Sequence, residues 1–321
     1  MATATAIRKP AKSPKAVRTV RDAAEETTKK IIAALEAGVV PWQKTWKSLG
    51  ADLPRSLSTG KPYRGVNVFT LWFEGIDKGY KSNHWGTYRQ ISERGGQVRK
   101  GEKSTEVVFW KIIEKSEKVD GKDRVKKIPL LRLFHVFNAD QADWAEGARL
   151  PQVAEPLEGF DPIAHAEAVV AEYLAKGPSL SHGGDRAFYR PATDHVQMPE
   201  FADFVSAEAY YSTLYHELTH STGHDSRLKR DGIADGTFGA FGDKVYSAEE
   251  LIAEMGAAML CSVAGIEQAA TLDNSASYLA HWIKALKGDN SLVIKAASAA
   301  QKAVDRIVGT TFKNEEEGGE S

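Results

Sequence analysis

Cysteine is nearly absent from this sequence, which has only Cys261 among its 321 residues. A lone cysteine excludes an intrachain disulfide and fits a reducing compartment, so we predict a cytoplasmic protein. Long hydrophobic runs are also lacking, and none approaches the ~20 residues that a membrane-spanning helix requires. The basic residues 1–20 contain no apolar stretch of the kind found in secretory signals. These absences predict a soluble protein that has no membrane as its partner.

The charged residues are divided unevenly between the two halves of the chain. Residues 1–150 carry 29 Lys and Arg against 17 Asp and Glu, a balance of +12, whereas residues 151–321 carry 13 against 26, a balance of −13. A basic half beside an acidic half marks a domain boundary and indicates a polyanion as the partner of the first half. A solvated charged surface without a partner is the alternative interpretation.

The chain length suggests about two domains, and a proline-bearing stretch of little periodicity over residues 151–162 is the predicted linker. The predicted domains cover residues 22–150 and 163–312, between a basic tail at 1–21 and an acidic tail at 313–321 that are both expected to be disordered. In the first domain we expect a helix at 22–37, strands at 107–110 and 131–137, and a charged hairpin loop at 114–127 between those strands.

The second half has the pattern of a mainly helical domain with a small sheet. Ser206 and Ser247 are the predicted N-caps of two of its helices, because serine side chains accept hydrogen bonds from the first free backbone N–H groups. The expected helices are 164–175, 206–221, 247–263, 275–286 and 291–308, and the expected strands are 187–190 and 195–199.

A His-Glu-x-x-His pattern is formed by His216, Glu217 and His220. Positions i and i+4 of a helix lie on one face, so both imidazoles can bind the same ion. Glu217 would then lie beside the open side of that ion, where a carboxylate can take a proton from water and pass it to a leaving amine. The pattern predicts a metal-dependent hydrolase with Glu217 as its base. Two solvated histidines on a surface helix are the alternative.

A catalytic zinc ion keeps three protein ligands and one open position, so a third ligand is needed. On the next predicted helix, Glu250 and Glu254 lie four residues apart and therefore share one edge. This arrangement resembles the gluzincins and implies Glu250 as the ligand and Glu254 as the carboxylate that orients a ligating imidazole. Glu249 remains the rival of Glu250, because the helix register is known only to about one residue. We predict one Zn²⁺ per chain, with Mn²⁺ or another divalent ion as a substitute in vitro.

His224 is a further candidate for the metal site. The metzincin pattern continues to a third histidine that would fall at position 226, but residue 226 is serine and His224 comes two residues early. We therefore rank His224 below Glu250 as a ligand. Lining the cleft and being an ordinary polar residue of the loop after the helix are the two alternatives for it.

A peptidase also needs groups that hold its substrate. An edge strand commonly pairs with an extended peptide, and residues 195–198 are the candidate strand. A donor to the charge that develops during hydrolysis could come from Tyr246, Tyr189 or His281, and the sequence does not choose among them.

Aromatic and basic residues are interleaved through residues 40–110. Sequence-tolerant binding of single-stranded DNA uses rings that stack on bases and cations that follow the phosphates. Tryptophan is more often a core residue, so we expect roughly half or more of these rings to be buried. The candidate DNA-binding residues are Trp42, Lys44, Trp46, Lys61, Tyr63, Arg64, Trp85, Tyr88, Arg89, Arg99, Lys100 and Lys103.

Several longer motifs resemble those of the ArdC-type antirestriction proteins. They lie at residues 38–42, 59–67, 85–88, 98–103, 136–141, 215–224, 249–260 and 278–286, so the resemblance extends over roughly residues 22–310 but not into the tails. It implies a single-stranded DNA-binding domain joined to a zincin-like metallopeptidase domain. Members of this family travel on plasmids and other mobile elements and protect incoming DNA from host restriction, and related N-terminal domains occur in plasmid primases.

These observations predict an α+β protein of two domains, a basic α+β DNA-binding domain and a mainly helical, gluzincin-like metallopeptidase domain. The first functional hypothesis is a zinc peptidase that cleaves a host protein near single-stranded DNA. The second is a non-catalytic protein that coats the entering strand, with a structural or vestigial metal domain, because nothing in the sequence identifies a peptide substrate. A third, a first half that binds a protein, predicts weak DNA affinity that is insensitive to salt.

Overall fold

The structure is a computed structural model that describes residues 20–38, 40, 53–119, 122–148, 161–234, 236, 244–266, 276–289 and 291–310. The predicted acidic tail, nearly all of the basic tail and residues 151–160 of the predicted linker lie outside the described residues. Trp42, Lys44 and Trp46 also lie outside them, so their assignment to DNA binding stays a prediction.

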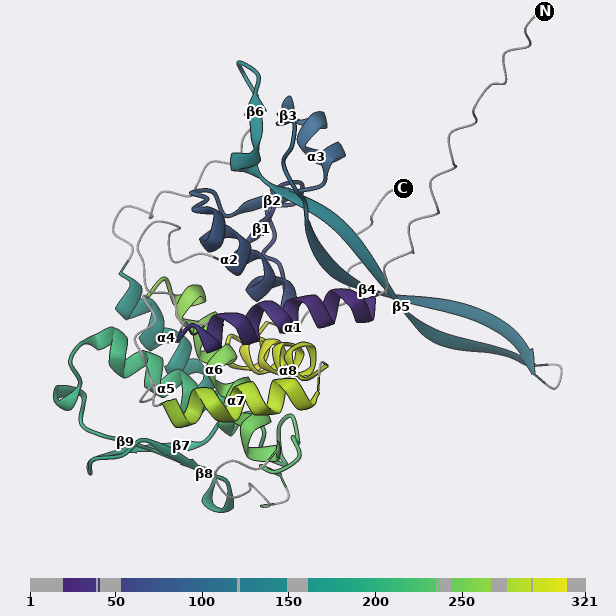
Figure 1. Ribbon diagram of the computed structural model, residues 1–321. Helices are drawn as coiled ribbons and strands as arrows, with labels where there is room; N and C mark the ends of the chain where they lie inside the picture. Colours follow the sequence, from purple (N-terminus) through teal and green to yellow (C-terminus); the bar gives the residue numbers. More distant parts are fainter. Residues whose placement is uncertain are drawn as a thin grey trace, which may run out of the picture.

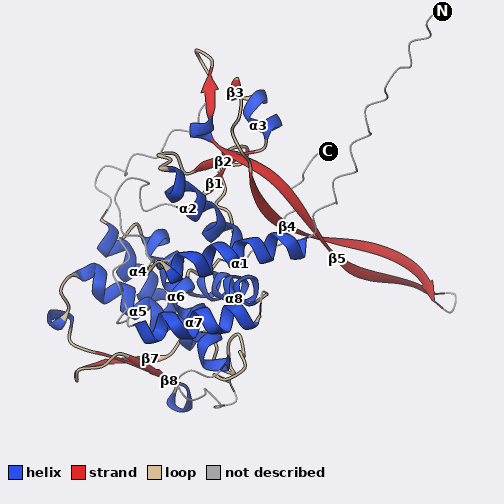
Figure 2. Ribbon diagram, viewed as in Figure 1, coloured by secondary structure: helices blue, strands red, loops and turns tan. Residues whose placement is uncertain are grey.

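The N-terminal part combines helices with two small sheets (Figures 1 and 2). The larger sheet has the strand order β1-β2-β5-β4, and β3 pairs with β6 in the smaller one. The helices are α1 (Val20–Glu36), α2 (Val66–Lys78) and α3 (Tyr88–Glu93). The strands are β1 (Arg55–Ser56), β2 (His84–Gly86), β3 (Gly96–Val98), β4 (Thr105–Val119), β5 (Lys122–Asn138) and β6 (Ala142–Trp144), with the 3₁₀ turn η1 (Ala139–Gln141) between the last two.

The helices α2 and α3 were not expected from the sequence. Many apolar side chains of α2 are β-branched or aromatic, which favours strands locally, but burial of Val68, Phe69 and Leu71 favours the helix. A usable signal existed for α3, because Thr87 and Gln90 form a capping box. The Gln90 N–H donates to Thr87 Oγ1 at 3.3 Å, and the Thr87 N–H donates to Gln90 Oε1 at 2.8 Å.

The hairpin predicted between the strands at 107–110 and 131–137 is present, but the predicted loop at 114–127 is wrong in length, because β4 and β5 run through most of it. The two strands pair continuously from Thr105↔Val136 to Val119↔Lys122, and the ribbon projects from the body of the molecule (Figure 1). Strand pairing is carried by backbone hydrogen bonds and does not require the apolar alternation that the sequence lacks here. The sequence Asp120-Gly121, which is typical of two-residue hairpin connections, was the signal for a shorter loop.

The C-terminal part is mainly helical, with a three-stranded sheet of order β7-β9-β8. No helix in the described part of the chain has the length and hydropathy needed to cross a bilayer. The helices are α4 (Pro162–Leu174), α5 (Ala207–Ser221), α6 (Lys244–Ala264), α7 (Ala276–Gly288) and α8 (Leu292–Ile307), and the strands are β7 (Ser179–His182), β8 (Phe188–Arg190) and β9 (His195–Met198). The short 3₁₀ turns are η2 (Pro191–Thr193) and η3 (Phe201–Asp203).

The two predicted serine caps differ in outcome. Ser206 caps α5 as predicted, because its hydroxyl accepts from the Ala209 N–H at 3.2 Å. Ser247 is not a cap: it is buried inside α6, since Val245 and Tyr246 continue that helix toward its N-terminus.

One hydrophobic core joins residues from both parts of the chain. Ile31 and Leu35 of α1 and Phe69 of α2 belong to the same buried cluster as side chains of α5, α6 and α8. In keeping with this, α1 packs against α7 and α8 (Figure 1). The small buried alanines of α8, among them Ala297 and Ala300, allow such close packing of helices.

Arg64, a predicted DNA contact, instead joins the two parts of the chain. Its Nη2 donates to Asp305 Oδ2 of α8 at 2.5 Å, and the neighbouring Gly65 N–H donates to Gln301 Oε1 at 3.0 Å. Gln301 Nε2 in turn donates to Asp305 Oδ1 at 3.1 Å. The guanidinium is therefore engaged by a carboxylate, and the assignment of Arg64 to DNA binding stays a prediction.

We expect Arg64→Ala and Asp305→Asn each to lower the free energy of unfolding by about 1–2 kcal/mol, because both break one partly buried, charge-assisted contact. Urea denaturation of the two single variants and the double variant measures this. The double variant should lose clearly less than the sum of the two single losses. Full additivity would show that Arg64 and Asp305 do not stabilise the fold through each other.

Candidate metal centre and its surroundings

The helices α5 and α6 carry the candidate metal ligands and pack side by side. His216 and His220 lie one turn apart on α5, and their Nε2 atoms are 3.1 Å from each other. Glu250 of α6 faces both, with Oε2 at 3.5 Å from His216 Nε2 and Oε1 at 3.5 Å from His220 Nε2. All three side chains are buried, and their ligand atoms lie within 4.8 Å of one another. The three residues therefore converge on one point.

The close approach of the two helices depends on Gly256 of α6. A Cβ atom at this position would lie 2.6 Å from Thr219 Cγ2 and 2.7 Å from Thr219 Oγ1 on α5. Thr219 is buried, and its hydroxyl donates to the Tyr215 carbonyl at 2.7 Å, so it has little freedom to move. The missing side chain of Gly256 is thus what brings Glu250 within reach of the imidazoles. No pattern in the sequence marks this glycine.

Each imidazole has a carboxylate behind it. Glu254 Oε1 lies 3.2 Å from His216 Nδ1, and Glu249 Oε1 lies 3.1 Å from His220 Nδ1. The Nε2 atom of each ring therefore remains available as a ligand at the point that Glu250 faces. Glu249 and Glu250, the two rivals for the third ligand, thus occupy different places: Glu250 faces both Nε2 atoms, and Glu249 faces the far side of one ring.

Arg230 completes the arrangement around Glu249. Its Nε donates to Glu249 Oε2 at 2.8 Å and its Nη2 donates to Glu249 Oε1 at 2.5 Å. The same guanidinium donates to Thr222 Oγ1 at 2.6 Å and to the Thr219 carbonyl at 2.8 Å, which ties it to the end of α5. Arg230 was missed in the sequence because it lies in the loop after α5, where no periodic pattern marks it.

The donors present fit a divalent cation. Two imidazole nitrogens and a carboxylate are the ligands that zinc prefers, and a buried carboxylate without a partner charge would be costly. Burial lowers the pKa of His216, but the carboxylates of Glu250, Glu254 and Glu217 beside it outweigh the burial and raise this pKa well above its ordinary value. This excess of negative charge around the imidazoles is what a bound cation would neutralise.

Glu217 lies beside this cluster and is itself buried. Burial raises the pKa of its carboxyl above the ordinary value, while the charges of His216 and His220 oppose the shift. The Tyr189 backbone N–H donates to the carboxylate. A raised carboxyl pKa suits a group that has to accept and then return a proton near neutral pH.

The edge strand beside the site is β8, which corrects the prediction of residues 195–198. Those residues form β9, which lies in the middle of the sheet and pairs with β7 on one side and β8 on the other. Among the described strands β8 pairs only with β9, and its Tyr189 N–H reaches Glu217. The sequence could not order three strands of three or four residues, because each has the same short pattern.

The predicted cleft residues are placed differently from one another. Tyr246 is half-buried and makes a hydrogen bond to Glu250, so it lies at the site. The Tyr189 hydroxyl donates to Asp194 Oδ1 at 2.9 Å, so it is engaged by that carboxylate. His224 Nδ1 lies 2.8 Å from Ser226 Oγ in the loop, and neither it nor His281 of α7 belongs to the cluster of candidate ligands.

Asp194 fastens β8 to the end of α5. Its carboxylate accepts from Arg227 Nη1 at 2.9 Å, from Arg227 Nη2 and from the Tyr189 hydroxyl. Arg227 Nε also donates to the Ser221 carbonyl at 2.8 Å. Burial raises the pKa of Asp194, but the hydrogen bonds from Arg227 and Tyr189 and the Arg227 charge hold it below its ordinary value. This contact fixes the edge strand relative to the metal helix.

We expect Asp194→Asn to lower the free energy of unfolding by about 1–2 kcal/mol at pH 7, because a neutral amide pairs less strongly with Arg227. A carboxyl whose pKa is depressed in the folded state stabilises above its unfolded pKa, and this stabilisation is lost as pH falls through the folded value. The wild type should therefore lose its advantage over the variant below about pH 4. Asparagine tolerates the positive φ of 46° at this position, so backbone strain does not differ between the wild type and the variant. A constant difference from pH 7 to pH 3 would contradict this assignment.

The predicted DNA-binding residues divide into buried and exposed groups. Trp85 is 1% exposed and Tyr63 is 7% exposed, and both belong to one small core cluster. Their ring faces are not open to bases, so the assignment of these two rings to stacking is wrong. The predicted DNA-binding residues that remain exposed are Lys61, Tyr88, Arg89, Arg99, Lys100 and Lys103.

Comparisons with known proteins match both halves of the chain. A family model for the N-terminal domain of anti-restriction factor ArdC matches residues 21–137, and a zincin-like metallopeptidase model matches residues 164–299. The metal-free crystal structure of the antirestriction ArdC protein from plasmid R388 is 40% identical, with a TM-score of 0.69, and the match covers 89% of this chain and 97% of that one. The Mn(II)-bound structure of the R388 protein is 41% identical, with a TM-score of 0.68 and the same coverage. The prediction of an α+β fold with these two domains is confirmed.

Two further relatives differ in the share of their own length that this chain matches. The uncharacterized protein y4eC of Sinorhizobium fredii is 39% identical over 296 residues, which are 90% of this chain and 92% of the relative. The DNA primase TraC of Escherichia coli is 37% identical over 311 residues, which are 91% of this chain but only 28% of the primase. The chain therefore corresponds to a part of that primase.

Proposed function

This chain belongs to the ArdC family of antirestriction proteins, and we propose that it binds single-stranded DNA and carries a zinc peptidase site. The observation that carries the peptidase part is the convergence of His216, His220 and Glu250 from two helices, with Glu217 beside them. In this proposal the protein acts in the cytoplasm, where it protects the incoming DNA of a mobile element from host restriction. Its peptide substrate is a host protein.

Zn²⁺ is the proposed ion, and Mn²⁺ is a substitute that the Mn(II)-bound structure of the R388 relative supports. His216 and His220 would hold the ion through Nε2 and Glu250 through its carboxylate, while Glu254 and Glu249 orient the two rings. Bound there, the ion would supply Lewis acidity to the reaction.

The protein's own groups perform the proton transfers. Glu217 takes a proton from the attacking water and returns it to the nitrogen of the leaving amine. The free edge of β8 binds the peptide in extended form, next to Glu217. The Tyr246 hydroxyl, which is hydrogen-bonded to Glu250, is the candidate donor to the substrate carbonyl oxygen as negative charge develops on it.

The DNA-binding part of the proposal rests on the N-terminal half. Its charge balance of +12 favours a polyanion, and exposed Lys61, Arg89, Lys100 and Lys103 supply cations on its surface. Such contacts release counterions from the phosphates, so the affinity should fall steeply with salt and depend little on base sequence.

Replacing Glu217 with glutamine tests the catalytic assignment. The variant should keep one metal ion per chain, because Glu217 is not among the proposed ligands, and proteolysis should fall by about 10²–10⁴-fold because the base is lost. Metal content is measured by atomic emission, and cleavage is measured on cell extract by mass spectrometry of new peptide termini. Equal cleavage by wild type and variant would remove Glu217 from the mechanism.

A restriction challenge with the same variant separates the peptidase hypothesis from the strand-coating hypothesis. Cells that carry a restriction system receive unmodified plasmid DNA by conjugation, with wild-type protein, Glu217→Gln or no protein present. Loss of protection with the variant supports the peptidase. Full protection supports a protein that coats the strand and whose metal domain has a structural role.

A further inference from the structure

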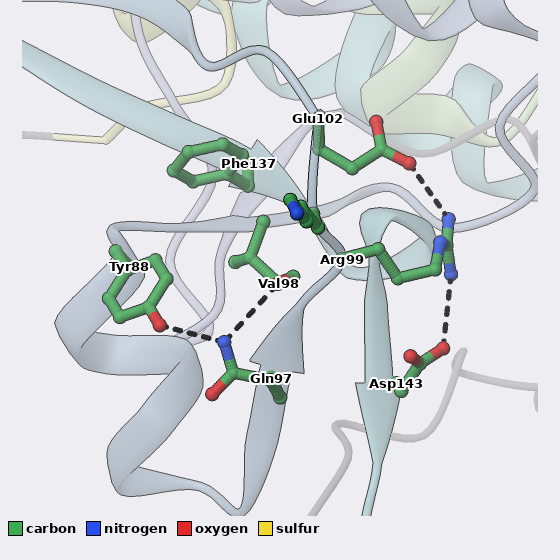
Figure 3. A pocket seen from close by; sticks show the side chains of 8 residues that line it. Tyr88, Gln97, Val98, Arg99, Glu102, Phe137 and Asp143 are labelled. Atoms are coloured by element: carbon green, nitrogen blue, oxygen red, sulfur yellow. Dashed lines mark hydrogen bonds and ion pairs between the residues drawn. The ribbon is translucent and has the colours of Figure 1, made fainter.

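An open groove of about 520 Å³ lies in the N-terminal domain, where α3, β3, β6 and the end of β5 meet. The rings of Tyr88 and Phe137 lie on one side of it, and the side chains of Arg99, Glu102 and Asp143 lie on the other (Figure 3). An aromatic wall thus faces a charged wall across a space that a single nucleotide could enter.

Tyr88 combines wide exposure with a fixed orientation. Its side chain is 51% exposed, although large aromatic side chains are usually covered. The ring stands edge-on to Phe137, with centroids 6.5 Å apart and planes at 72°. Its hydroxyl accepts from Gln97 Nε2 at 2.7 Å. A ring that is already held in place loses little conformational entropy when a planar ligand stacks on it.

The acidic side chains of the groove are balanced from within the protein. Arg99 pairs with Glu102 at 3.1 Å and with Asp143 at 3.5 Å, and it donates to the Asp140 carbonyl at 2.5 Å. Gln141 also donates to Glu102, at 3.0 Å. Arg99 is therefore largely engaged by protein groups, which makes it part of the frame of the groove and a poor candidate for a phosphate contact.

Two lysines beside the groove carry charge that the protein does not use. Lys100 and Lys103 are exposed, and the described residues provide neither ammonium group with a hydrogen bond or an ion pair. They flank a tight turn in which the Glu102 N–H donates to the Arg99 carbonyl at 3.3 Å and Gly101 has a φ of 95°. The turn holds two available cations next to an available ring.

We infer that this groove binds one unpaired nucleotide of single-stranded DNA, with its base stacked on Tyr88 and the neighbouring phosphates at Lys100 and Lys103. The inference rests on the proposed DNA binding and assigns it to this groove. A planar ring bearing a phosphate is the ligand that matches an exposed aromatic face beside two free cations. In a duplex both faces of each base are covered by its neighbours, so the groove selects unpaired strands.

The test measures binding of the full chain to a fluorescein-labelled oligothymidylate of ~15 nucleotides by anisotropy. Tyr88→Ala should weaken binding by about 5- to 100-fold, whereas Tyr88→Phe, which keeps the ring, should stay within roughly threefold of wild type. The double variant Lys100→Ala/Lys103→Ala should reduce the slope of log K against log salt by about 1.4, because each lost phosphate contact removes about 0.7 on a single strand.

Matched controls come from the C-terminal domain. Phe201 is 50% exposed, and Lys176 and Lys302 are exposed. Phe201→Ala and Lys176→Ala/Lys302→Ala should leave both the affinity and the salt slope within about twofold of wild type, because none of these side chains lines the groove. Thermal melting of every variant verifies that it is folded.

A second readout locates the strand directly. An oligothymidylate with one 5-iodouracil should crosslink on irradiation to a peptide that contains Tyr88, and excess unlabelled single strand, but not duplex, should suppress the crosslink. If wild type binds DNA while Tyr88→Ala binds equally well and crosslinks lie elsewhere, the groove is not the site although the proposed DNA binding stands. If wild type shows no salt-dependent binding, the proposed DNA binding itself fails and the groove assignment with it.

Discussion

Replacing Glu249 with alanine should weaken zinc binding by about 10- to 100-fold and lower the free energy of unfolding by about 3–5 kcal/mol. Two causes combine. The His220 Nδ1 atom loses the carboxylate at 3.1 Å that orients its ring, and the nearly buried Arg230 loses its paired charge. Zinc affinity is measured by competition with a chromophoric chelator, and stability is measured by urea denaturation of the metal-free protein.

A double variant separates the two causes. In Arg230→Met/Glu249→Leu both charges are replaced by apolar groups of similar volume, which is often neutral or stabilising for a buried pair. The stability of the metal-free protein should therefore return, whereas zinc affinity should stay low because His220 still lacks its acceptor. Recovery of zinc affinity in the double variant would show that Glu249 supports the fold but does not position the ligand.

Replacing Gly256 with valine should lower the free energy of unfolding by about 1–3 kcal/mol and weaken zinc binding by roughly tenfold or more. Any Cβ at this position meets Thr219 within 2.7 Å, so α6 must shift away from α5. That shift carries Glu250 and Glu254 away from the imidazoles that they face. The better helix propensity of a residue other than glycine offsets less than about 1 kcal/mol of the loss.

A second substitution that restores zinc binding to the Gly256→Ala variant provides the control. Thr219→Ala removes Cγ2 and Oγ1, the two atoms that the new Cβ would meet most closely, so Gly256→Ala/Thr219→Ala should bind zinc more tightly than Gly256→Ala alone. A double variant that binds no better than Gly256→Ala, although it is folded, would mean that the crossing of the helices does not set the ligand geometry.

The basic N-terminal half shows where residue patterns mislead. Trp85 and Tyr63 are core residues and Arg64 pairs with α8, whereas Tyr88, Lys100 and Lys103 remain exposed. In the sequence these residues are equivalent, because aromatic and basic residues alternate throughout the segment. Which ring is covered depends on where α2, β2 and β5 meet, and that is a consequence of packing between residues far apart in the chain.

The His-Glu-x-x-His helix could be derived from the sequence because its geometry is local: a residue and its neighbour one turn away share a face whatever the rest of the chain does. The charge division, the two-domain plan and the capping of α5 by Ser206 follow from equally local or summed properties. The different places of Glu249 and Glu250, the partnership with Arg230 and the choice of β8 as edge strand were decided only by the tertiary structure. Each depends on how closely α6 crosses α5 at Gly256 or how three short strands order themselves, and such distances between separate elements leave no periodic trace in a single chain.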